Sequence, residues 1–151
     1  MPSRSDIEND MKTALKGGEK ERLVTIRMLL AAIQQKEVDE RIELDEVQII
    51  GVAEKLIKQR RESADLYRKA EREELAAKEE SEILILKAYL PEPLGEAELA
   101  ALIDEVIRET GASNIKDMGQ VMGQIKARAH GRADMAKVSP QVRARLAPAH
   151  S

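Results

Sequence analysis

Residues 116–137 combine glycines with basic side chains, the residue types best suited to holding an anionic ligand. The glycines, which expose bare backbone, are Gly119, Gly123 and Gly131. The basic candidates are Lys116, Lys126, Arg128, His130, Arg132 and Lys137. Clustered Lys and Arg bind phosphate backbones by releasing counterions, so such binding is sensitive to salt. The segment therefore predicts a surface that binds a polyanion.

Each of these features also has a purely structural interpretation. A basic run can be no more than the solvated face of a helix. Glycine inside a helix costs about 1 kcal/mol relative to alanine, so Gly119 and Gly123 need a compensating gain. We expect close helix packing to supply it, with Met118 and Met122 filling the gaps. Close approach of a ligand to the backbone is the alternative.

The charge distribution favours a polyanionic partner. The whole chain has a net charge of −3, but residues 111–151 contain seven Lys and Arg against two Asp. Such asymmetry is typical of chains whose basic part meets an anionic partner. Aromatic residues are missing from this part of the sequence, so backbone contacts are expected rather than base stacking.

The sequence contains no recognisable stand-alone active site. It has no cysteine, which excludes disulfides and cysteine-ligated metals. Its two histidines are far apart in the chain, a pattern that does not indicate a metal site. A glycine-rich phosphate loop and a Gly-x-Ser-x-Gly elbow are both missing. We therefore predict no catalytic residues, no cofactor and no metal ion.

The composition indicates an all-α protein. The chain has no Phe or Trp and only two Tyr, so its core must consist of aliphatic residues and Met, which suit helix packing. No apolar run approaches the roughly 20 residues that span a membrane. The N-terminus lacks the apolar stretch of a signal peptide. These observations predict a cytoplasmic protein without a membrane anchor.

The sequence predicts helices throughout the chain, including the segments that carry the basic residues. Apolar spacing predicts an N-terminal bundle of about four helices, near residues 5–16, 19–40, 46–70 and 72–89. Their inner faces are expected to include Leu15 and Val47. A continuous helix through residues 70–71 is the alternative, because neither Gly nor Pro interrupts the pattern there. The basic residues near Arg60 are expected to pair with the acids that follow.

Pro91 and Pro93 mark the predicted domain boundary, because proline ends a helix and restricts the residue before it. The predicted domains are an N-terminal bundle, 1–90, and a small three-helix domain, 95–151. Within the second, helices are expected at 96–110 and 115–129, the latter capped by Asn114. Ser139 and Pro140 resemble a helix start, so the last helix is predicted to begin or restart there.

Five segments, which follow one another along the sequence, make nearly the whole chain similar to the YqeY-like proteins. They are Glu21–Leu29, Lys58–Ser63, Tyr89–Leu94, Lys116–Gly123 and Gly131–Asp134. These proteins are related to the tail of the B subunit of glutamyl/aspartyl-tRNA amidotransferase. Together they form the GatB/YqeY family. The resemblance implies two helical domains, and it implies that the C-terminal one contacts tRNA.

The resemblance thus implies a non-catalytic tRNA-binding or adaptor module in tRNA-dependent amidation. The family label is carbon–nitrogen ligase with glutamine as amido donor, although the chain carries no amidase machinery. The basic residues given above would contact the tRNA backbone. One alternative is an accessory subunit that joins the amidotransferase subunits. Another is a helical protein-interaction scaffold without RNA binding, which an exposed apolar stripe on the third or fourth helix would favour.

Overall fold

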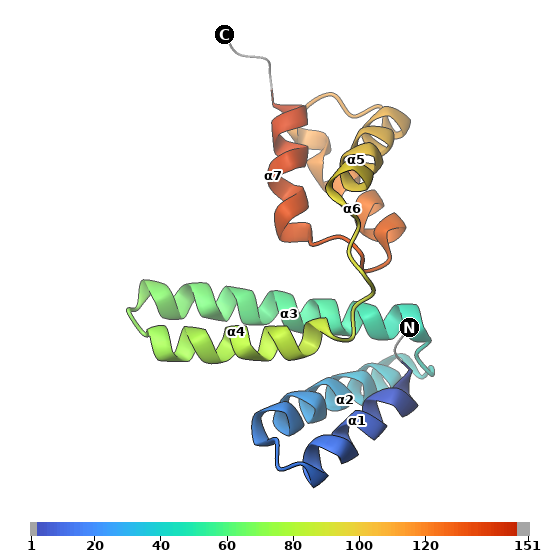
Figure 1. Ribbon diagram of the computed structural model, residues 1–151. Coiled ribbons are helices and arrows are strands. Elements are labelled where there is room, and N and C mark those ends of the chain that lie inside the picture. Colours follow the sequence, from blue (N-terminus) through green and yellow to red (C-terminus); the bar gives the residue numbers. More distant parts are fainter. Residues whose placement is uncertain (1–2, 148–151) are drawn as a thin grey trace. The chain divides into compact units, whose positions relative to one another are not determined.

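The computed structural model describes residues 3–147, which contain seven α-helices, one short 3-10 helix and no strand (Figure 1). The predicted all-α fold is confirmed. The helices fall into two compact units, Met1–Pro91 and Glu92–Ser151. The first contains α1 to α4, and the second contains α5 to α7.

The first unit begins with two helices that pack side by side, α1 (Arg4–Lys16) and α2 (Lys20–Glu40) (Figure 1). The Ser3 side chain accepts from the backbone N–H of Asp6, and the Asp6 carboxylate accepts from the N–H of Ser3. This reciprocal capping fixes the start of α1. Gly18 takes the left-handed conformation, with φ +68°, in the turn between the helices.

A longer hairpin follows, formed by α3 (Glu46–Lys69) and α4 (Glu73–Lys87). Asp45 caps α3, its side chain accepting from the backbone N–H of Gln48 at 2.8 Å. A continuous helix through residues 70–71 is not formed. Glu71 adopts φ 58° without being glycine, and this left-handed residue turns the chain so that α4 returns along α3.

The core of the first unit is aliphatic. Its fully buried large side chains are Ile7, Ile26, Leu29, Ile33, Ile50 and Leu86. Two predictions were wrong, since Leu15 is 58% exposed and Val47 is 48% exposed. Successive helix residues are rotated by about 100°, so burial of the neighbouring Ala14 turns Leu15 outward. On α3, Ile49 and Ile50 take the inward positions in place of Val47.

Two polar contacts join distant parts of the first unit. The Tyr89 hydroxyl, after α4, donates to the Asp10 carboxylate of α1 at 2.7 Å. Burial raises the pKa of Tyr89, and the bond to Asp10 raises it further. Glu37 of α2 accepts from Arg4 and from the backbone N–H of Leu44 at 3.0 Å. It therefore fixes the α2–α3 loop against the start of α1.

The second unit consists of α5 (Glu96–Thr110), a 3-10 turn η1 (Ile115–Asp117), α6 (Met118–Ala129) and α7 (Met135–Leu146). Both α5 and α7 pack against α6. Fully or almost fully buried side chains form its core: Ile103, Val106, Val121, Ile125, Val138, Val142 and Leu146.

Two helix boundaries in this unit differ from the sequence prediction. Asn114 caps as expected, but residues 115–117 form a 3-10 turn before α6. The last helix begins at Met135 rather than at Ser139, because the Asp134 side chain accepts from the N–H of Ala136 at 3.0 Å. Pro140 therefore lies inside α7. The hydrogen bond it cannot donate would have gone to Ala136, an exposed residue near the helix start.

Candidate functional site

The predicted basic surface of the second unit is spread over several elements. Lys116 lies on η1, Lys126 and Arg128 on α6, and Lys137 on α7. His130 ends α6 in the left-handed conformation, with φ 49°, while the half-buried Arg132 follows in the loop. Which of these residues contact a ligand stays a prediction. Their hydrogen bonds and ion pairs within the chain nevertheless distinguish Arg128 and Arg132 from the three lysines.

Arg128 is neutralised by acidic residues of α5. Its guanidinium pairs with Glu105 at 3.7 Å and forms a shorter contact with Glu109. The hydrogen bond from Arg128 lowers the pKa of Glu109 below its ordinary value. A phosphate would have to compete with two carboxylates for this side chain, which joins α6 to α5.

Arg132 attaches the segment after the domain boundary to the second unit. Its Nε donates to the backbone carbonyl of Glu92 at 2.9 Å, and its own carbonyl accepts from the N–H of Leu94 at 2.8 Å. Among the predicted set, Lys116, Lys126 and Lys137 have no ion pair recorded in residues 3–147. The structure thus does not bring the six residues together as one cluster of unpaired cations.

The expected packing role of two glycines is wrong. Gly119 and Gly123 are exposed, and a Cβ atom added at either would meet no heavy atom within 4 Å. Gly131 differs, because its φ of 81° requires the left-handed conformation directly after His130. The glycines of α6 therefore do not serve contacts within the unit.

The first unit contains a buried ion pair that sequence analysis missed. Nε of Arg60 on α3 lies 3.0 Å from a carboxylate oxygen of Glu82 on α4, and both residues are buried. Its Nη1 donates to the carbonyl of Leu56 at 3.3 Å, and its Nη2 donates to the sulfur of Met28 at 3.3 Å. Arg60 lies on the same helix face as the apolar Ile57 and Ala64, three and four positions away. This spacing is the feature of the sequence that indicates its burial.

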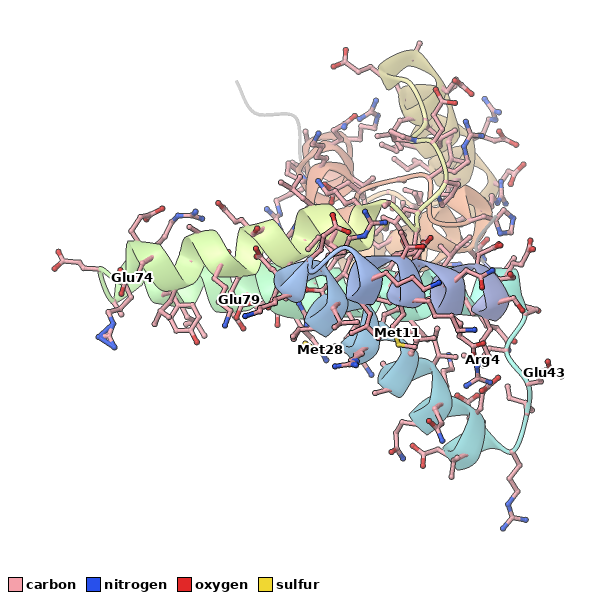
Figure 2. The ribbon with its side chains drawn as sticks, turned by 60° about the horizontal axis from the view of Figure 1, so that its bottom comes forward. Arg4, Met11, Met28, Glu43, Glu74 and Glu79 are labelled. Atoms are coloured by element: carbon pink, nitrogen blue, oxygen red, sulfur yellow. The ribbon has the colours of Figure 1, made fainter. Side chains whose placement is uncertain are left out.

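A second carboxylate borders this pair. Glu79 on α4 is half-buried, and Figure 2 shows it together with Met28 of α2. Burial raises the pKa of Glu79 above its ordinary value, and the negative charge of Glu82 adds to the increase. Arg60, Glu79 and Glu82 therefore form a charge cluster in which a single guanidinium faces two acids.

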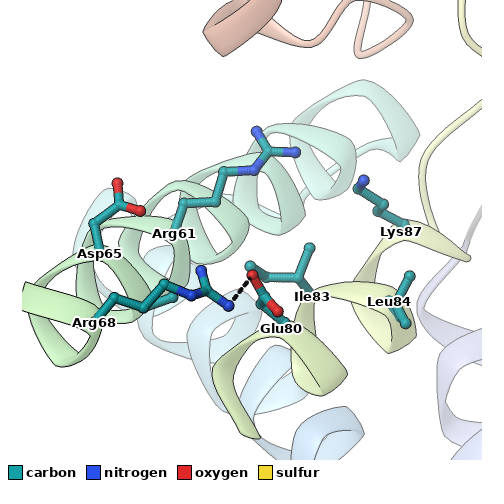
Figure 3. A pocket seen from close by; sticks show the side chains of 8 residues that line it. Arg61, Asp65, Arg68, Glu80, Ile83, Leu84 and Lys87 are labelled. Atoms are coloured by element: carbon teal, nitrogen blue, oxygen red, sulfur yellow. Dashed lines mark ion pairs between the residues drawn. The ribbon is translucent and has the colours of Figure 1, made fainter. Parts of the chain in front are cut away.

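A groove with a volume of about 470 Å³ runs along one face of the α3–α4 hairpin (Figure 3). Its lining repeats at helical spacing on both helices: Arg61, Ala64, Asp65 and Arg68 on α3, and Glu80, Ile83, Leu84 and Lys87 on α4. Ala64 and Ile83 are buried and form an apolar floor. Leu84, by contrast, is 70% exposed.

The groove has a charged rim whose two ends differ. At one end Arg68 pairs with Glu80 at 2.6 Å (Figure 3). Arg68 also pairs with Glu73 at 3.4 Å. The helices are antiparallel, so the pairing of Arg68 with Glu80 places Arg61 opposite Lys87 at the other end. That end carries Arg61 and Lys87, with the acid Asp65 one helical turn from Arg61, while the apolar floor lies between the two ends.

The described part of the chain offers neither a metal site nor a membrane-spanning helix. Within residues 3–147, no three His, Cys, Asp or Glu side chains are grouped so as to hold a metal ion. None of the helices in that range combines the length and apolar character needed to cross a bilayer.

Curated relatives resemble the chain over much of its length. A protein of Lachancea thermotolerans named "Altered inheritance of mitochondria protein 41, mitochondrial" is 37% identical over 117 residues, 76% of this chain and 63% of the relative. A protein of the same name from Eremothecium gossypii is 38% identical, covering 68% of this chain and 58% of the relative. A third, from Pyrenophora tritici-repentis, is 30% identical over 82% of this chain and 71% of the relative. The chain thus spans less than two thirds of the first two relatives.

These relatives overturn two predictions. They carry a name that refers to mitochondrial inheritance and not to an amidotransferase. The predicted function as a tRNA-binding adaptor or accessory subunit in tRNA-dependent amidation is therefore wrong. The same names describe mitochondrial proteins, which contradicts the predicted cytoplasmic location. The predicted function was taken from the amidotransferase tail, whereas these relatives carry a different name.

The family itself is established by a match over almost the whole chain. The family model described as "Yqey-like protein" matches residues 4–146. That range includes every α-helix of the described residues and extends over most of both units. The chain belongs to the Yqey-like protein family.

Proposed function

We propose that this chain is a protein-binding module whose α3–α4 groove receives an amphipathic helix with an apolar face and an acidic end. The single observation that carries the proposal is the groove itself. It has a buried floor of Ala64 and Ile83, with the 70% exposed Leu84 beside it. The names of the relatives give a process and an organelle but no ligand, so the proposal rests on the groove.

The shape of the groove favours a helix over a small molecule. Small-molecule sites enclose most of their ligand, whereas this groove is open along its side. Its lining spans two turns of each helix, a length of about 10 Å. A third helix laid along it would meet the groove with residues at i, i+3, i+4 and i+7, the usual pattern of helix-in-groove recognition.

The charges of the rim give the occupant its polarity. Arg68 is already held by Glu80 and Glu73, so that end offers little net charge. Arg61 and Lys87 lie opposite each other at the other end, and Lys87 has no ion pair recorded among residues 3–147. An acidic residue at the matching end of the partner helix would pair with Lys87. Because this contact is exposed, it should add direction more than affinity.

A peptide selection tests this proposal. A library of displayed helices with fixed apolar positions and random flanking positions would be selected on the full chain. It would then be counter-selected on Leu84→Gln. Enriched sequences should carry Glu or Asp at one end and should be lost with Leu84→Gln. Enrichment of basic helices, or of sequences indifferent to Leu84, would contradict the proposal.

A second copy of the chain is the main competing occupant. Sedimentation of the full chain at increasing concentration distinguishes the two cases. A monomer is expected over the concentrations at which peptides bind. Self-association that Leu84→Gln abolishes would assign the groove to a second copy and overturn the proposed heterologous helix.

The division into domains 1–90 and 95–151 is also a proposal. The compact units on either side of Pro91 support it. Limited proteolysis of the full chain should cut first between residues 91 and 95 and leave two helical fragments. Cutting first inside a helix, or loss of helicity on cleavage, would contradict it. A common ancestry of residues 95–151 with the amidotransferase tail stays a prediction.

A further inference from the structure

The guanidinium of Arg60 is buried with one poor hydrogen-bond acceptor. Its Nε and Nη1 meet oxygen atoms of Glu82 and Leu56, but the partner of Nη2 is the sulfur of Met28, 3.3 Å away. A thioether sulfur is only a weak acceptor. A buried charge is stable when its donors are well satisfied, so this corner of the cluster would gain from a stronger acceptor.

Met28, which supplies that sulfur, is partly open to the solvent. The residue is 43% exposed, whereas Arg60 is 6% exposed. The other methionines within residues 3–147 are half-buried and pack against the two cores: Met11, Met118, Met122 and Met135. Among the described methionines, Met28 is therefore the one that an oxidant in water reaches most readily.

We propose that Met28 is a site of reversible oxidation to the sulfoxide by a hydroperoxide such as hydrogen peroxide. A sulfur lone pair attacks the peroxide, so an S–O bond forms while the O–O bond breaks. The leaving hydroxide takes the remaining proton and becomes water. Sulfur is oxidised and the peroxide is reduced. A sulfoxide reductase reverses the change by taking two electrons and two protons from a dithiol, which becomes a disulfide, and releasing the oxygen as water.

The consequence at this position is the reverse of the usual one. Sulfoxides normally disrupt apolar packing because they add a polar oxygen. The oxygen forms on the solvent side of the sulfur, because the lone pair that faces Nη2 of Arg60 is already engaged. Rotation about the terminal bonds of the side chain then brings the oxygen to Nη2, where it accepts a charge-assisted hydrogen bond, which is stronger than a neutral one. The flexible, partly exposed Met side chain can withdraw enough to make room for it. Oxidation should therefore tie α2 more firmly to α3 and stabilise the first unit.

The experiment treats the full chain with hydrogen peroxide until the intact mass shows one added oxygen. Peptide mapping then distinguishes Met28 from the other five methionines in the sequence. Urea unfolding, followed by circular dichroism, compares the untreated, oxidised and reductase-treated protein. Among the methionines of residues 3–147 we expect the first oxygen at Met28, with a higher urea midpoint after its oxidation and return of the midpoint after reduction.

Two variants show whether the new oxygen is responsible. Met28→Gln supplies a carbonyl acceptor, whereas Met28→Leu supplies none and cannot be oxidised. Met28→Gln should unfold at a higher midpoint than Met28→Leu, and peroxide at the same dose should not raise the midpoint of Met28→Leu. Earlier oxidation of Met11, Met118, Met122 or Met135, an unchanged or lower midpoint in the protein oxidised at Met28, or equal midpoints for the two variants would each overturn the proposal.

Discussion

Replacing Arg60 by methionine should destabilise the first unit strongly at neutral pH and only slightly in mild acid. The change leaves Glu82 buried without its partner, next to the second acid Glu79. An unpaired buried carboxylate escapes its desolvation penalty by taking up a proton. The proton uptake therefore sets an upper limit to the loss of stability.

That limit can be calculated. Protonating a glutamate whose ordinary pKa is about 4.5 costs about 3.4 kcal/mol at pH 7 and about 0.7 kcal/mol at pH 5. The chain's stability is a few times the larger figure at most. With a urea dependence of about 2 kcal/mol per molar, the unpaired carboxylate in Arg60→Met should lower the midpoint at pH 7 by up to about 1.7 M. The difference from wild type should nearly vanish by pH 5.

Urea unfolding of the full chain at pH 5, 6 and 7 measures this directly. The matched control is the double variant Arg60→Met with Glu82→Leu, which removes both charges and should recover most of the stability. A loss for Arg60→Met below about 1 kcal/mol at pH 7, or one that does not change with pH, would refute the assignment of a desolvated pair.

Three further changes test other parts of the structure. The raised pKa of Glu79 means that folding is favoured while the group is protonated and less favoured as pH rises through its folded value. Glu79→Gln should therefore be more stable than wild type at pH 7 and equal to it near pH 4, as judged by urea midpoints. Glu37→Ala removes the acceptor of the Leu44 N–H and should cost about 1–3 kcal/mol in the same assay. Gly119→Ala and Gly123→Ala meet open space, so each should raise stability by about 0.5–1 kcal/mol, seen as a higher melting temperature; a loss would show that these positions do pack.

Local features of the fold were predictable because their causes are local. The cap at Asp45 needs only the side chain and the backbone N–H three residues on. The stop at Gly111 needs only a left-handed residue after α5. The break at Glu71 had no such signal, since a non-glycine residue adopts the left-handed conformation there. Packing of α4 back onto α3 stabilises it, and a local pattern does not contain that information.

The candidate sites depended on pairings between distant residues. Arg60 and Glu82 are 22 positions apart, so helical spacing placed Arg60 among apolar neighbours without naming its partner. Arg128 was counted as available for an anion because its partners, Glu105 and Glu109, belong to another helix. The groove arises only when the faces of α3 and α4 are set side by side.

The central claim is that the α3–α4 groove binds an acidic amphipathic helix, and the affinity of one selected peptide tests it most directly. Its dissociation constant would be measured by fluorescence anisotropy for the full chain, Leu84→Gln and Leu66→Gln. The two leucines are almost equally exposed, at 70% and 65%, but Leu66 is not among the residues that line the groove. Burying a leucine contributes about 1.5–3 kcal/mol. The account therefore predicts binding roughly 10- to 100-fold weaker for Leu84→Gln and unchanged for Leu66→Gln. Equal affinities for the two variants would contradict it.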